Sequence, residues 1–116
     1  MKPPVDDFLP LAPAMLHILL ALAGESLHGY GIMQEVLRQT DNRYKLGPGT
    51  LYDNLQRLMK QKLVEEVSLR HEENSRRRYY RLSSLGRRVL SAEVTRLEGV
   101  VKTARIHLKP LEPRRA

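Results

Sequence analysis

The chain has 116 residues, and its 20 lysines and arginines against 13 aspartates and glutamates give a formal net charge of +7. This length suits one domain with a modest core, and the lack of cysteine excludes disulfides and thiolate metal sites. The excess positive charge favours nucleic acid or another anionic surface as partner, with solubility alone as the alternative explanation. The apolar run 15–23 is too short to span a membrane, and acidic residues stand where a signal peptide needs positive charge. We therefore expect a soluble, cytoplasmic protein without membrane contact.

Proline dominates the N-terminal end, because residues 1–13 hold four of the seven prolines. This composition predicts an extended arm, whose apolar side chains dock on another part of the molecule. Pro13 suits the first position of a helix, since its missing N–H is not needed there. Apolar residues then recur at helical spacing as far as Gly24, which we expect to end this first helix.

Two further helices follow, separated by a turn-rich segment. The first of them is predicted over 29–39 and the second from Pro48, with the turn formers of 40–49 between them. In the second, leucines at spacings of four and three form one stripe to be buried. The opposite face is polar and carries Gly49, Asp53, Gln56, Arg57 and Lys60.

The apolar period then changes from about 3.6 to 2, which is typical of strands. Segments 63–69 and 77–82 both alternate, and the polar residues 70–75 lie between them. This pattern predicts a β-hairpin with a long, charged tip.

The last predicted helix begins at a cap formed by Ser83 or Ser84 and ends before Pro110. Apolar residues recur along it at heptad spacing, and a long terminal helix with one such seam needs a partner. We predict that the seam forms a homodimer, with packing onto its own domain as the alternative. The predicted dimer contacts are Leu90, Val94, Leu97, Val101, Ala104 and Leu108.

Three helices, a basic hairpin and a fourth helix make a mainly α fold with a small β-hairpin. This order is that of a winged helix-turn-helix, in which the third helix enters a DNA major groove and the hairpin is the wing. The third helix starts with GPGT, where free N–H groups face outward and glycines leave room for a DNA backbone. The alternative is that these glycines only make the turn.

Candidate DNA contacts lie on the third helix and on the wing. On the helix, Gln56 suits an adenine edge, and Arg57 suits a guanine or a phosphate. On the wing, an arginine cluster stands where it would follow a minor groove or its phosphates, although such a run is often only a solvated face. The full set of predicted DNA contacts is Tyr30, Lys45, Gly49, Thr50, Tyr52, Asp53, Gln56, Arg57, Arg76, Arg77 and Arg78.

Catalytic and metal motifs are not found in the sequence. The four histidines are not paired at helical spacing, and GPGT lacks the lysine and the third glycine of the phosphate- and dinucleotide-binding motifs. His28 precedes a helix and is expected to cap it. The sequence therefore predicts no enzyme, no metal and no cofactor.

Four segments together resemble the PadR-type transcriptional regulators: HGYGI (28–32), GPGTLYDNLQRL (47–58), KLVEE (62–66) and RRRYYRLSSLGRRVL (76–90). The resemblance implies a winged-helix homodimer that represses transcription by binding an inverted repeat in double-stranded DNA. It also implies dimer contacts through the C-terminal helix and an N-terminal segment. By motif position, Tyr30, Thr50 and Tyr52 would face DNA, whereas Tyr80 and Leu82 would hold the wing to the core. With a single helix after the wing, this chain is similar to the short members.

We expect four parts: an arm (1–13), a winged-helix domain (14–83), a dimerisation helix (84–109) and a tail (110–116). Two other functions stay open, because fold alone does not decide between them. The basic face of a winged helix could bind an acidic protein, or it could bind RNA. The sequence identifies neither the operator nor a small-molecule inducer, and it leaves open whether one exists.

Overall fold

The computed structural model describes residues 4–68 and 77–110. The predicted hairpin tip 70–75, Arg76 and tail residues 111–116 lie outside the described residues. The elements in chain order are η1 (Val5–Phe8), α1 (Pro13–Ala21), β1 (Leu27–His28), α2 (Gly29–Gln39), α3 (Pro48–Lys60), β2 (Val64–Val67), β3 (Tyr79–Leu82) and α4 (Ser84–His107). This mainly helical arrangement with a small antiparallel sheet confirms the predicted fold class.

Helix α1 begins at Pro13 as predicted, but it ends at Ala21, before Gly24. The helix stops early because its last turn tightens, with the Ala23 N–H donating to the Leu20 carbonyl at 3.2 Å. Ile18 and Leu19 are fully buried, so α1 forms the centre of the core between α2, α3 and α4.

Helices α2 and α3 form the helix-turn-helix, and both begin where the sequence predicted. Each helix is followed, two residues after its end, by a residue with a left-handed φ: Asp41 after α2 (φ 51°) and Lys62 after α3 (φ 63°). In each case the next N–H bonds back to a carbonyl of the last turn, as Leu63 does to Leu58 at 2.9 Å. Leu58 is also fully buried, as the leucine stripe predicted.

Among the described residues, the sheet has three strands in the order β1–β3–β2, and both pairings are antiparallel. Both hairpin strands are shorter than predicted, and β1 was missed by the sequence analysis. Its two residues pair with β3, Leu27 with Tyr80 and His28 with Tyr79. A strand of two residues has no alternation that a sequence could reveal, so only its pairing defines it.

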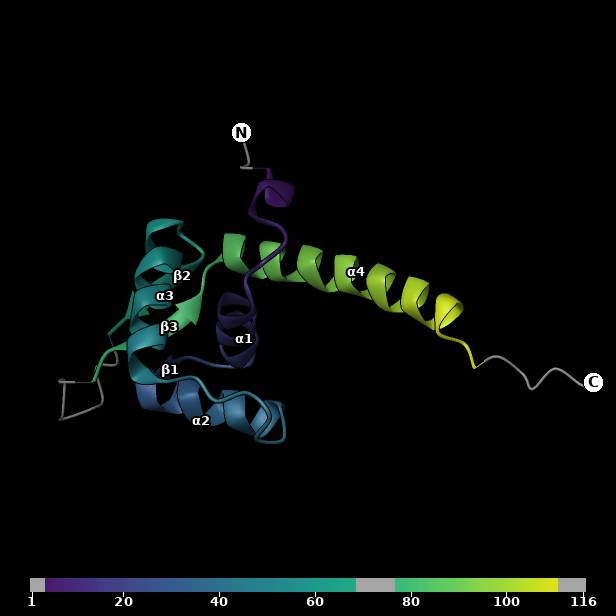
Figure 1. The fold of residues 1–116 in the computed structure, drawn as a ribbon. Coiled ribbons are helices and arrows are strands. Elements are labelled where there is room, and N and C mark those ends of the chain that lie inside the picture. The colour runs from purple at the N-terminus through teal and green to yellow at the C-terminus, as the bar shows by residue number, and fades with distance from the viewer. Residues whose placement is uncertain (1–3, 69–76, 111–116) are drawn as a thin grey trace, which may run out of the picture.

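Helix α4 is capped by Ser83, whose Oγ accepts the Gly86 N–H at 2.9 Å. Its first turns lie over the core, and the rest projects away from the other helices (Figure 1). The arm is not extended throughout as predicted, because Val5–Phe8 form a 3-10 helix that packs on α4. Leu11 is buried, and its N–H donates to the fully buried carboxylate of Glu93 at 2.9 Å. None of the described helices is both long and apolar enough to cross a membrane.

Candidate nucleic-acid interface

One hollow of about 440 Å³ brings together predicted contacts from three elements. Tyr30 comes from α2, Tyr52 from α3, and Arg77 and Arg78 from the residues before β3. Both tyrosines are exposed, Tyr30 at 61% and Tyr52 at 49%. Guanidinium groups and phenol hydroxyls around one concavity are the donors that a phosphate oxygen accepts from. We call this concavity the basic hollow; its other lining residues are His28, Gly29 and Tyr80.

Gly29 explains how Tyr52 reaches this place. A Cβ on Gly29 would stand 2.9 Å from the Cζ of Tyr52 and closer still to its hydroxyl. The first residue of α2 must therefore lack a side chain so that the ring from α3 can lie across the start of α2. Gly29 was not among the predicted contacts, although the HGYG segment contains it.

His28 connects α2 to the wing. Its Nδ1 accepts the Gly31 N–H at 3.0 Å, which confirms the expected cap. Its Nε2 lies 3.3 Å from Nη1 of Arg77, and its ring makes a T-shaped contact with the Tyr79 ring at a centroid distance of 5.2 Å. The side chain that caps α2 thus also lies beside a wing arginine, a contact that spacing in the sequence could not reveal.

Tyr80 forms the inner wall of the basic hollow and is only 3% exposed. Burial raises the pKa of its phenol, and the carboxylate of Glu66, opposite it in the sheet, raises the pKa further. The phenol therefore stays protonated at neutral pH and remains a hydrogen-bond donor.

The outer face of α3 forms a second hollow, of about 660 Å³. Three predicted contacts line it: Asp53, Gln56 and Arg57. Met59 and Lys60 complete the lining, although the sequence analysis had not named them as contacts. A carboxylate, an amide and two cations on one exposed helix face are the groups that pair with base edges and phosphates.

The start of α3 is open. Gly49 and Thr50 are exposed, and a Cβ on Gly49 would meet nothing within 4 Å. No glycine in the described part of the chain has a positive φ, so the backbone at Gly49 does not require glycine. The alternative that this glycine is needed to make the turn therefore has no support in the conformation.

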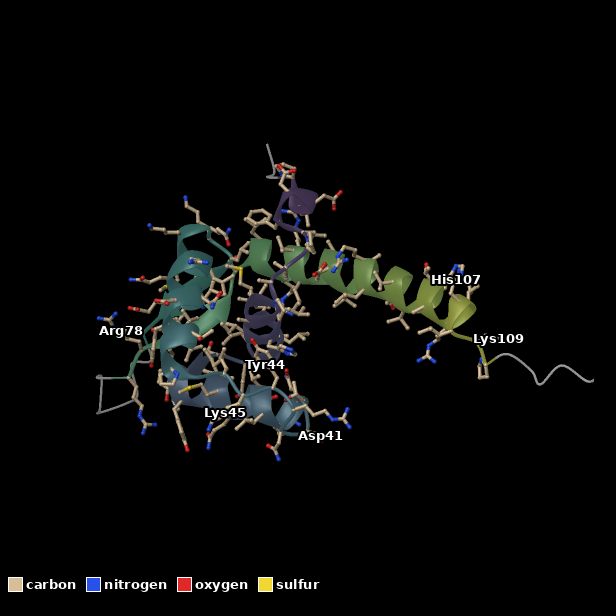
Figure 2. All side chains as sticks on the ribbon, viewed as in Figure 1. Asp41, Tyr44, Lys45, Arg78, His107 and Lys109 are labelled. Atoms are coloured by element: carbon tan, nitrogen blue, oxygen red, sulfur yellow. The ribbon has the colours of Figure 1, made fainter. Side chains whose placement is uncertain are left out.

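Three predicted contacts in the described part of the chain line neither hollow: Lys45, Gly49 and Thr50. Lys45 is exposed on the segment that leads into α3 and is not among the residues that line either hollow (Figure 2). Arg76 lies outside the described residues. Arg78, which Figure 2 labels, is exposed just before β3, the central strand of the sheet.

Along α4, the predicted seam divides into a buried and an exposed part. Leu90 is 6% exposed and belongs to the core of its own domain. Val94 and Val101 are 40% and 48% exposed, and with Leu97 they line a hollow of about 470 Å³. Val100, which the heptad pattern omitted, is 50% exposed next to Val101. We call the exposed part the apolar strip: Val94, Leu97, Val100, Val101, Ala104 and Leu108.

Within residues 4–68 and 77–110, no three histidine, aspartate or glutamate side chains gather closely enough to hold a metal ion.

Residues 18–92 match the transcriptional regulator PadR-like family. The chain belongs to this family. It is 34% identical to a transcriptional regulator of Mycobacterium tuberculosis over 91 residues, which cover 78% of this chain and 81% of that protein. The match confirms the resemblance seen in the sequence, and the family and this relative are described as transcriptional regulators.

Solved PadR structures share the fold. A PadR family regulator from Clostridium difficile superposes with a TM-score of 0.71 at 22% identity, over 84% of this chain and 99% of that one. PadR of Bacillus subtilis in complex with operator DNA superposes with a TM-score of 0.63 at 18% identity, over 73% of this chain and 48% of that one. At these identities the likeness concerns the fold alone.

Proposed function

We propose that this regulator is a sequence-specific DNA-binding repressor that binds an inverted-repeat operator as a homodimer in the cytoplasm. The observation that carries the proposal is the convergence of Tyr30, Tyr52, Arg77 and Arg78 on the basic hollow, beside the polar outer face of α3. The B. subtilis PadR structure with operator DNA supports the same use of this fold.

In this proposal α3 lies in the major groove, where Gln56 reads an adenine edge and Arg57 contacts a guanine or a phosphate. The basic hollow holds the DNA backbone, with the hydroxyls of Tyr30 and Tyr52 and the wing arginines donating to phosphate oxygens. At the start of α3 a phosphate approaches Gly49, where no side chain stands in the way. Phosphate contacts position the protein, and the α3 side chains supply sequence preference.

The apolar strip is the proposed dimer contact. An exposed row of aliphatic side chains on a projecting helix favours burial against a second copy. A two-fold dimer presents two α3 helices to two half-sites in opposite directions, which is why we expect an inverted repeat. Leu90 contributes to this contact only by holding α4 on the core.

The dimer is tested by replacing Leu97 and Val101 together with aspartate. The double variant should sediment as a monomer at concentrations where the parent is a dimer. Ile106→Asp is the matched control, because Ile106 is 63% exposed but outside the strip. A parent chain that is already monomeric at micromolar concentration would refute the dimer.

The decisive experiment for DNA binding is selection of bound duplexes from a random pool at physiological salt. An enriched inverted repeat supports the proposal, and its half-site spacing gives the distance between the two α3 helices. No enrichment would overturn it and would favour an acidic protein partner for the basic face. In the enriched case, Gln56→Ala should change preference at particular bases; equal weakening on all sequences would remove Gln56 from base reading.

A further inference from the structure

The wing carries a carboxylate close to the proposed DNA contacts. Glu66 on β2 pairs with Tyr80 on β3, so its side chain projects from the same face of the sheet as Tyr80. Its Oε1 lies 3.9 Å from Nε of Arg78, one of the cations of the basic hollow. The Glu66 and Arg78 side chains are 48% and 74% exposed. The pair therefore lies at the rim of the hollow, in contact with solvent.

The neighbouring acidic residue has a different position. Glu65 pairs with Arg81, whose Nε donates to Glu65 Oε2 at 3.0 Å. Successive residues of a strand point to opposite faces, so this second pair lies on the side of the sheet away from Tyr80. Neither Glu65 nor Arg81 lines the basic hollow. The strand thus offers two glutamates of equal charge and similar exposure, only one of which is beside the hollow.

We propose that Glu66 is an internal competitor for DNA phosphate, which lowers the affinity of the wing by pairing with Arg78 in the free protein and repelling the phosphate that Arg78 would bind. This inference rests on the proposed DNA-binding function. A phosphate bound by Arg78 would lie within a few ångströms of the Glu66 carboxylate, well inside the screening length of about 8 Å at physiological salt. The repulsion therefore persists under the conditions in which the protein works.

A competitor of this kind lowers the affinity of the protein for DNA of any sequence. Phosphate contacts contribute to binding on every sequence, so lowering their strength weakens binding to ordinary DNA. It weakens binding to an operator by the same factor, because the same phosphate contact is made there. Glu66 thereby sets the affinity of the wing for DNA without itself contacting a base.

The test compares Glu66→Gln with Glu65→Gln on a mixed-sequence duplex, titrated at several salt concentrations. No operator is needed, because backbone binding is independent of sequence. Both variants lose one negative charge, so their difference isolates the local effect. We expect Glu66→Gln to bind about three- to tenfold more tightly than Glu65→Gln near 0.15 M salt. Its affinity should also fall more steeply with salt, by up to about 0.9 in the logarithmic slope.

A second pair of variants assigns the effect to Arg78. In an Arg78→Ala background, Glu66→Gln should give no gain over Glu65→Gln, since the cation for which it competes is gone. Both glutamate variants should keep the parent's unfolding curve, because exposed pairs add little to stability.

Four outcomes overturn the inference. Equal affinity of the two glutamine variants would remove Glu66 from the competition, and a gain that persists without Arg78 would mean that Arg78 is not its target. If the parent chain and all variants fail to bind any duplex, the proposed DNA-binding function falls as well. A parent that binds DNA while Glu66→Gln brings no gain refutes the competitor alone.

Discussion

Gly49→Ala should raise stability and lower DNA affinity, and this opposite pair of effects tests how closely DNA approaches α3. Gly49 is the second residue of α3, is exposed and has no positive φ. The added Cβ would meet nothing within 4 Å, so the folded state gains no clash. Alanine also restricts the unfolded chain, and the free energy of unfolding should rise by about 0.5–1 kcal/mol.

The effect on binding follows from the same methyl group. If a phosphate packs against the backbone at Gly49, the methyl group occupies part of that space, and such overpacking costs about 1–3 kcal/mol. This corresponds to a loss of roughly 5- to 150-fold in affinity. Urea unfolding measures the first effect, and fluorescence anisotropy with a labelled duplex measures the second.

Gly99→Ala is the matched control. Gly99 lies within α4, is exposed, and a Cβ there would also meet nothing within 4 Å. It should show a similar stabilisation, of about 1 kcal/mol, with unchanged DNA affinity. If Gly49→Ala binds DNA as tightly as Gly99→Ala, the close approach at the start of α3 is refuted. If Gly49→Ala unfolds at a lower urea concentration than the parent, the added methyl group does not fit at Gly49, and the inference that the space there is open is wrong.

Three further substitutions test the packing that positions the interface. Gly86→Ala should destabilise the fold by about 3 kcal/mol or more, because the Cβ of the new alanine would overlap the Leu63 carbonyl. A urea midpoint equal to that of the parent would show that α4 can shift away from Leu63. Lys62→Gly should raise the free energy of unfolding by about 1 kcal/mol, because Lys62 has a left-handed φ of 63° that glycine adopts more easily. An unchanged free energy of unfolding would mean that lysine adopts this φ without strain. Glu93→Gln should lower the melting temperature by several degrees at pH 7, because the hydrogen bond from Arg96 holds the pKa of Glu93 below its usual value. This stabilisation is present above the pKa that Glu93 has in the unfolded chain, and it is lost as the pH falls through the lower pKa of the folded state. The difference in melting temperature from the parent should therefore shrink in acid, and a difference that stays constant with pH would mean that the charge of Glu93 does not stabilise the fold.

Most helix boundaries were predictable because the signals that set them are local. Pro13 and Pro48 begin helices through their own fixed φ, and Ser83 caps α4 with its own hydroxyl. The early end of α1 and the missed β1 are the exceptions. For β1, the deciding hydrogen bonds come from its pairing with β3, which joins residues that no periodic pattern connects. For α1, the deciding bond is local, from the Ala23 N–H to the Leu20 carbonyl, but Leu22 and Ala23 are residue types that suit a helix and do not mark its end.

For the interface, sequence alone named the residue types but not their grouping. Tyr30, Tyr52, Arg77 and Arg78 were all predicted contacts, yet their convergence on one hollow depends on Gly29 admitting the Tyr52 ring. In the seam of α4, the sequence grouped residues that the structure separates. Its spacing treats Leu90 and Val101 alike, whereas the core covers the first and leaves the second 48% exposed.

By itself, the sequence determined the family, the order of the helices and the polar face of α3, because these follow from periodicity, capping and motifs within a few neighbouring residues. Only the tertiary structure decided which charges are close together. Glu65 and Glu66 are adjacent and chemically identical, but the pleat of β2 directs one toward Arg81 and the other toward Arg78 beside the basic hollow. The reason is physical: electrostatic interaction depends on distance in space, and β-pairing brings together residues that lie far apart along the chain.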